Sequence, residues 1–351
     1  MIGWEDIYNV ISAMIPLYVA LLLGYGSVKW WHMFKPDHCD AINRLNCYFI
    51  MPLFVCDFTS RIDPYKMSYK FIAADAISKA IILITISLWA NCSIKGSYQW
   101  SVTSFSLSSL NNTLVVGVPL MRAMYGTFGE NLVIQSSILQ SLLWNMFLLF
   151  LLEFERAKQQ MDLEVVPNNS ATDVECNGIH EDASRRPSVL ITMKIVGLKV
   201  AKNPNSYACI LGLFWALVAY RWNLKMPKIL EGSIVIMSRA GSGVAMFCIG
   251  LFMALQEKIV HCSVKLTMFG MVLRFVAAPA TMAIGSLCIG LRGNILRVAI
   301  IQAALPQALA SFTYAKEYGL HVNVLSTAVI FGTIVSIPVL VAYYAVLDLL
   351  N

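Results

Sequence analysis

The stretches SSLNNTLVVGVPLMRAMYG (residues 108–126) and AIIQAALPQALASFTYAKEYG (residues 299–319) decide the fold that the sequence predicts. Each stretch is largely apolar but is interrupted in its interior, by Asn111 and Asn112 in the first and by Pro306 in the second. These residues disfavour a continuous helix. A single break would suggest a proline kink, which is common in membrane helices. Two breaks at corresponding places instead favour a transporter, because paired interrupted helices form binding sites there.

The composition indicates a protein with many membrane-spanning helices. Of the 351 residues, 58% are hydrophobic and only 13% are charged, whereas soluble proteins carry about 25% charged residues. In a soluble fold, so few charges would leave large apolar surfaces facing water. The composition therefore excludes an ordinary cytosolic enzyme, a disordered protein and a nucleic-acid-binding protein. The excess of 26 Lys and Arg over 20 Asp and Glu is typical of cytoplasmic loops near anionic membrane lipids.

A spanning helix needs about 20 mostly apolar residues. This criterion predicts an all-α membrane protein with ten transmembrane helices, five on each side of a polar segment at residues 155–190. That segment is too short for a domain and is predicted to be a loop. The predicted spans are residues 7–27, 39–60, 69–91, 101–125, 130–154, 203–221, 228–255, 263–290, 294–317 and 322–349.

The two halves of the chain are weakly similar, which predicts an internal repeat. The aligned positions are Ser68, Lys70 and Lys79 with Ser263, Lys265 and Arg274, and Tyr125-Gly126 with Tyr318-Gly319. Repeats with an odd number of helices must be inverted relative to each other in the membrane, as in many secondary transporters. We therefore expect a first five-helix repeat at residues 1–154, a short cytosolic loop at 155–190 and a second repeat at 191–351.

The positions of Lys and Arg predict the orientation of the chain in the membrane. Most of the loop Lys and Arg residues fall on the same side as the segment 155–190. Cytoplasmic loops carry such an excess, so we expect this segment in the cytosol and both termini on the opposite side.

A few polar residues within the predicted spans are candidates for function. Asp75 and Lys79 lie four residues apart on one helix face and can pair. Intramembrane ionisable residues are often functional, and a purely structural ion pair is an equally open interpretation. Gln140 and Asn145 suit hydrogen bonds between helices. Arg274 is expected to be interfacial or paired, and it is given no role.

Motifs for enzymatic chemistry are absent from the sequence. It contains no nucleotide-binding P-loop, no HExxH zinc motif and no GxSxG nucleophile motif. The nine cysteines are scattered and form no CxxC pair, so they are interpreted as small buried hydrophobic residues. The sequence therefore predicts a protein that is not an enzyme and that has no cofactor and no metal site.

Several long stretches resemble the PIN-FORMED auxin efflux carriers of plants. They are DIYNVISAMIPLYVALLLGYGSVKWW at 6–31, LNNTLVVGVPL at 110–120, NPNSY at 203–207, VAIIQAALPQ at 298–307 and AKEYGLH at 315–321. The resemblance covers both helical halves and leaves out only the central segment. That segment is short, and the stretches WWHMF at 30–34 and ILEGSIVIMS at 229–238 are most similar to the short-loop branch of the endoplasmic reticulum.

The resemblance implies an elevator-type transporter. Helices 1, 2, 6 and 7 would form a scaffold domain, and helices 3–5 and 8–10 would form a transport domain that moves against it. The broken helices 4 and 9 would cross at mid-membrane. The family forms homodimers, so a homodimer is implied here as well.

The resemblance also implies a binding site for indole-3-acetate at the helix crossover. Asn111 and Pro306 would mark the two breaks, Asn112 would contact the substrate carboxylate, and Asp75 and Lys79 would support transport. The pocket would be lined by Val55, Val115, Gln140, Asn145 and Leu309. This chain has Asn111 where many relatives have proline, and Val55 and Asn145 replace a serine and a tyrosine of the family pocket.

Together these observations predict an auxin transporter. It would carry the indole-3-acetate anion between the cytosol and the lumen of the endoplasmic reticulum by alternating access, with auxin and membrane lipids as partners and no nucleic acid. A location in the plasma membrane is the alternative. Two other functions stay open: a sodium- or proton-coupled organic anion symporter of the same fold, and a membrane auxin receptor that does not transport.

Overall fold

The structure is a computed structural model that describes residues 4–92, 96–164, 189–256 and 262–349. In these residues the chain is helical and has no strand; the one β-bridge joins Asn111 and Gln307. The α-helices are α1 (Trp4–Lys29), α2 (Pro36–Leu45), α3 (Met51–Arg61), α4 (Tyr69–Cys92), α5 (Tyr98–Ser109), α6 (Val118–Leu139), α7 (Asn145–Glu164), α8 (Val189–Lys202), α9 (Pro204–Trp222), α10 (Lys228–Leu255), α11 (Val264–Val272), α12 (Ala278–Cys288), α13 (Asn294–Ala303), α14 (Leu309–Tyr318) and α15 (Val322–Leu349).

Short helical turns of other types connect several of these helices. The π-helical turns are η1 (Asn46–Ile50), η3 (Thr113–Gly117), η4 (Gln140–Trp144) and η5 (Leu273–Ala277), and η2 (Pro64–Lys66) is a 3-10 turn. Through η3 and η4, the helix that begins at Thr113 continues into α6 and α7. Within α6, only Gly126 departs from helical geometry. It has a φ of 64°, a conformation that glycine adopts without a steric penalty.

Six segments of the described chain are long and apolar enough to span a membrane. They are Tyr8–Lys29, Tyr69–Cys92, Thr113–Ala157, Lys228–Leu255, Val264–Cys288 and Val322–Leu349. This result confirms the predicted all-α membrane protein. The predicted span 39–60 is divided among α2, η1 and α3, and the predicted spans 101–125 and 294–317 are interrupted at residues 110–112 and 304–308.

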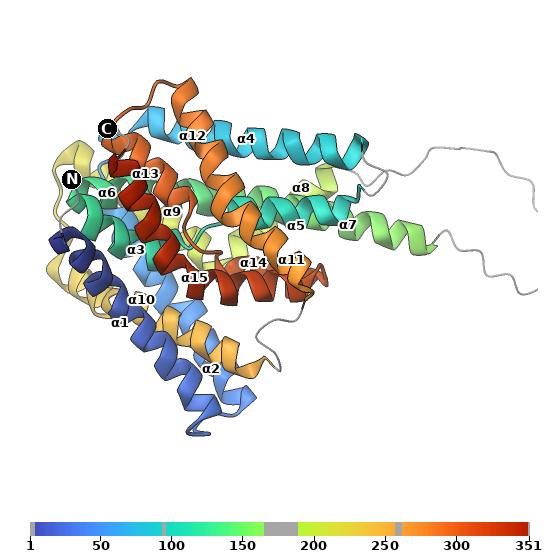
Figure 1. Ribbon diagram of the computed structural model, residues 1–351. Coiled ribbons are helices and arrows are strands. Elements are labelled where there is room, and N and C mark those ends of the chain that lie inside the picture. The colour runs from blue at the N-terminus through green and yellow to red at the C-terminus, as the bar shows by residue number, and fades with distance from the viewer. Residues whose placement is uncertain (1–3, 93–95, 165–188, 257–261, 350–351) are drawn as a thin grey trace, which may run out of the picture.

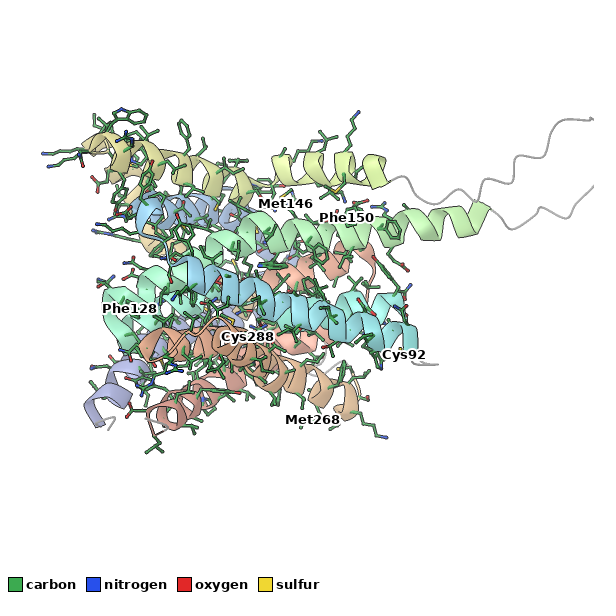
Figure 2. All side chains as sticks on the ribbon, turned by 90° about the horizontal axis from the view of Figure 1, so that it is seen from above. Cys92, Phe128, Met146, Phe150, Met268 and Cys288 are labelled. Atoms are coloured by element: carbon green, nitrogen blue, oxygen red, sulfur yellow. The ribbon has the colours of Figure 1, made fainter. Side chains whose placement is uncertain are left out.

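Helices lie on both sides of the central polar segment along the chain. α7 continues to Glu164, inside the segment predicted as a loop, and residues 165–188 lie outside the described residues. The chain resumes with α8, whose buried Val196 packs against Met146 and Phe150 of α7. Figure 2 shows these two residues on α7 beside α8.

Lys199 of α8 forms ion pairs and a hydrogen bond with residues of two other helices. Lys199 Nζ lies 2.5 Å from Glu153 Oε1 of α7 and 2.8 Å from Glu317 Oε1 of α14, and it donates to the Tyr318 hydroxyl at 2.6 Å. Burial would lower the pKa of Lys199, but its hydrogen bonds with Glu153, Glu317 and Tyr318 raise it above its ordinary value. Lys199 therefore stays charged at neutral pH and holds α8 against α7 and α14.

The helices form two packed groups, one around α1 and α10 and one around α4 and α12 (Figure 1). α1 and α10 approach closely because Gly250 lies against the backbone of Leu21 and Gly24 lies against the backbone of Phe247. α3 and α9 pack together beside α10. Gly243 on α10 makes no such contact, since a Cβ at that position would meet open space.

We predict that Gly250→Ala destabilises the protein, because the added methyl group would collide with the α1 backbone. Overpacking of this kind costs about 1–3 kcal/mol. The matched control is Gly243→Ala on the same helix, which has space for the methyl group and gains helix propensity. The check is thermal unfolding of the purified variants in detergent, where Gly250→Ala should melt below the wild type and Gly243→Ala should not. Equal melting temperatures would contradict the assigned packing.

Candidate functional site

The two interrupted helices cross through extended backbone at their breaks. α5 ends at Ser109 and the helix resumes at Thr113, whereas α13 ends at Ala303 and α14 begins at Leu309. The Asn112 N–H donates to the Pro306 carbonyl at 2.9 Å, and the Ala308 N–H donates to the Leu110 carbonyl at 3.2 Å. These two bonds flank the Asn111–Gln307 bridge. The breaks predicted from sequence therefore meet in space.

Two amide side chains hold the crossing together reciprocally. Asn111 Nδ2 donates to the Gln302 carbonyl at 2.7 Å, and Gln307 Nε2 donates to the Ser106 carbonyl at 2.8 Å. Both acceptors lie in the last turn of a helix, α13 or α5, and each also accepts a backbone N–H from its own half, Leu305 on Gln302 and Leu110 on Ser106. Each half of the chain thus adds a side-chain donor to the helix end of the other half.

Gln140, the first residue of η4, forms hydrogen bonds with the backbone at the first break. Its Oε1 accepts from the Asn111 N–H at 3.0 Å, and its Nε2 donates to the Asn111 carbonyl at 2.7 Å. Gln140 is buried, and both of its amide atoms are occupied by backbone. The structure thus gives this predicted pocket residue a bracing role, in agreement with the hydrogen bond between helices that its residue type suggested.

Arg274 is the residue at the crossing to which the sequence assigned no role. Its side chain is 1% exposed, so an interfacial position is excluded. Nε donates to the Leu305 carbonyl at 2.5 Å and Nη1 to the Leu107 carbonyl at 3.2 Å. The Leu305 carbonyl lies just after the end of α13, and the Leu107 carbonyl lies in the last turn of α5. The alignment of Arg274 with Lys79 between the two halves was the signal that could have pointed to it.

The helices that resume after the breaks begin without side-chain caps. Asn112 is the N-cap residue before Thr113, and Ala308 is the N-cap residue before α14; neither makes a side-chain cap hydrogen bond. The first N–H groups of a helix have no partner within the helix. Side chains thus donate to carbonyls at the C-termini of α5 and α13, whereas no side-chain cap is made at the two N-termini.

Asp75 and Lys79 form a buried ion pair next to the crossing, as their spacing predicted. Lys79 Nζ lies 2.9 Å from Asp75 Oδ2, with both side chains 7% exposed. Trp144 Nε1 donates to the same carboxylate oxygen at 3.0 Å, and the Lys79 ammonium lies 4.9 Å from the centre of the Trp144 ring. Sequence reasoning missed Trp144.

A small cavity connects this ion pair with the crossing. Its volume is about 10 Å³, the lower limit of the space that one water molecule needs. Its lining includes Asp75, Lys79, Asn111 and Gln302. The ion pair and the first break therefore share one polar environment.

The apolar residues predicted for the pocket lie in a single core. Val55 and Val115 are buried members of one hydrophobic cluster, and Leu309 packs against that cluster. Asn112 and Asn145 are partly exposed, at the start of η3 and of α7. Among the described residues, no group of three or more His, Cys, Asp or Glu side chains could hold a metal ion.

We predict that Gln140→Leu destabilises the protein by about 2 kcal/mol or more, because the Asn111 N–H and carbonyl would both lose a buried partner. Gln140→Glu should have a smaller effect at a pH where the buried carboxyl group is protonated, since it can then accept from the Asn111 N–H and donate to the Asn111 carbonyl. Thermal unfolding of both variants in detergent measures the difference. A Gln140→Leu protein as stable as the wild type would contradict the bracing role.

The chain is similar in sequence to known membrane transport proteins. Residues 9–344 match the family described as membrane transport protein. The chain is 57% identical to auxin efflux carrier component 5 of Arabidopsis thaliana and 50% identical to probable auxin efflux carrier component 5a of Oryza sativa subsp. japonica, with complete coverage of both chains in each case.

A more distant relative shows what this chain lacks. Auxin efflux carrier component 4 of Arabidopsis thaliana is 28% identical, covering 99% of this chain and 100% of the relative. That alignment runs over 617 positions, although this chain has only 351 residues. The relative therefore carries a long insertion that is missing here. These proteins are transporters and not enzymes, and the chain belongs to the membrane transport protein family, among the short-loop PIN-FORMED auxin efflux carriers.

Proposed function

We propose that this protein is a carrier of the indole-3-acetate anion that works by alternating access between the cytosol and the lumen of the endoplasmic reticulum. One observation carries the proposal: at the crossing, the carbonyl ends of α5 and α13 are closed by side chains, whereas the helices beginning at Thr113 and Leu309 have no side-chain cap. Auxin as the substrate is supported by the auxin efflux carriers to which the chain is similar.

Uncapped helix N-termini suit a carboxylate. Each N-terminus carries roughly half a positive elementary charge, in addition to free N–H donors. Two of them at one crossing can bind a monovalent anion without a lysine or arginine in direct contact with it. We assign to Asn112, whose side chain makes no cap hydrogen bond, a hydrogen bond to the same carboxylate.

The indole ring needs an apolar wall beside these donors. Val55, Val115 and Leu309 belong to one hydrophobic core, and we propose that they receive the ring. Asn145 would add a polar contact at the edge of the pocket. Gln140 would act indirectly, by holding Asn111 in place.

The reciprocal bonds at the crossing support the inverted-repeat architecture with ten spanning helices. Asn111 with the Gln302 carbonyl and Gln307 with the Ser106 carbonyl are related by one constant offset along the chain, as are the two backbone bonds of the bridge. Such equivalence is expected of two copies related by a twofold axis in the membrane plane. The repeats would be residues 1–154 and 191–351, joined by the cytosolic segment 155–190.

Alternating access requires two bodies that move relative to each other. We propose a scaffold domain made of α1–α3, α9 and α10, which pack on one another, and a transport domain made of α4–α7 and α11–α15. The crossing and the ion pair would move together in the second domain. Dimerisation would occur through the scaffold, as the family resemblance implies, and both termini would face the lumen.

Transport by purified protein in sealed liposomes tests this function. We expect saturable uptake of radiolabelled indole-3-acetate that responds to an imposed voltage and needs neither a sodium nor a proton gradient. Under this result the neutral Asp75–Lys79 pair is structural. A requirement for sodium or protons would instead support a coupled symporter, with this pair as the coupling candidate. Binding without uptake would support a receptor.

We predict that Asn112→Ala lowers indole-3-acetate uptake about tenfold or more, since a hydrogen bond to a charged group contributes about 1.5–3 kcal/mol. The thermal stability should be retained, because the Asn112 side chain caps no helix. Asn91→Ala, on the exposed end of α4, is the matched control and should transport like the wild type. Undiminished uptake by Asn112→Ala would remove this residue from the site.

A further inference from the structure

We infer that Arg274 gives the crossing its preference for anions by neutralising the carbonyl ends of α5 and α13, without touching the substrate. The inference rests on the proposed function and deepens it. It makes Arg274 a positioning residue for the charge of the site, distinct from the residues that would contact the carboxylate.

Four helix ends meet at the crossing, and their partial charges oppose one another. The C-termini of α5 and α13 each carry roughly −0.5 elementary charge, and the N-termini at Thr113 and Leu309 each carry roughly +0.5. Left alone, the four ends would nearly cancel. A carboxylate approaching the N-termini would then also feel the repulsion of the nearby carbonyls.

Arg274 joins the two negative ends. Its Nε and Nη1 atoms donate to the Leu305 and Leu107 carbonyls, so one guanidinium contacts the last turn of α5 and the backbone two residues after the end of α13. The planar fork of arginine bonds both carbonyls at once, and a lysine at this position would keep the positive charge that the inference requires, with a less fixed geometry. The backbone connects the residue directly to the binding region, because the Pro306 carbonyl, next to Leu305, accepts from the Asn112 N–H.

The charge of Arg274 has no carboxylate partner among the described residues. Asp75 is paired with Lys79, so that pair is neutral overall. Nη2 of Arg274 is buried and has no hydrogen-bond partner within the described part of the chain. Since burying an uncompensated charge is costly, the positive charge is expected to be met by the two helix ends and by an anion bound at the crossing.

The test compares two ligands that differ in charge and hardly in shape, indole-3-acetate and the neutral indole-3-acetamide. Binding of both is measured with purified wild type, Arg274→Gln and Arg274→Lys. We expect Arg274→Gln to lose about tenfold or more of its preference for the acid over the amide, with amide affinity within about threefold of the wild type. Arg274→Lys should retain most of the preference. Arg239→Gln, which removes an exposed arginine on α10, is the matched control and should leave the preference unchanged.

The outcomes separate this inference from the proposed function. Equal weakening of both ligands in Arg274→Gln would mean that Arg274 is only structural and would overturn the inference, as would an unchanged preference. A wild type that binds neither ligand would overturn the proposed function and the inference with it. If Arg274→Gln does not fold, Arg274→Lys decides: a retained preference for the acid supports the inference, and a lost one overturns it.

Discussion

The structure depends on the need of buried backbone groups for hydrogen-bond partners where two membrane helices are interrupted. Each interruption frees N–H and carbonyl groups that water cannot reach inside a membrane. The two breaks supply these partners to each other. The Asn112 N–H donates to the Pro306 carbonyl, and the Ala308 N–H donates to the Leu110 carbonyl. The Asn111 and Gln307 side chains donate to carbonyls at the opposite helix ends. These hydrogen bonds join the two halves of the chain at the crossing.

The C-terminal and N-terminal helix ends at the crossing differ in their hydrogen-bond partners. The carbonyl ends are closed by Arg274, Asn111 and Gln307, whereas the N–H ends at Thr113 and Leu309 have no side-chain cap. In a purely structural crossing, all four ends would be expected to be closed, because a buried helix end without partners is unfavourable. The asymmetry suits an anion, and it agrees with the chain's membership of a family that contains auxin efflux carriers.

The ion pair beside the crossing adds no net charge to it. Asp75 and Lys79 neutralise each other, and Trp144 Nε1 donates to the same Asp75 oxygen that Lys79 contacts. Gln140 uses both amide atoms on Asn111. The close contact of α1 with α10 at Gly250 provides a tightly packed group of helices beside this region.

The sequence by itself determined the membrane class, most helix positions, both breaks and the Asp75–Lys79 pair. Each of these follows from local composition or from a spacing of a few residues, which a helix converts directly into geometry. Only the tertiary structure decided the partners of the breaks. Asn111 and Gln302 are 191 positions apart in the chain, and Arg274 bonds one carbonyl in the last turn of α5 and one in the segment after α13. Such partners depend on the path of the backbone in space, because a carbonyl acceptor is present at every residue and leaves no mark in the sequence.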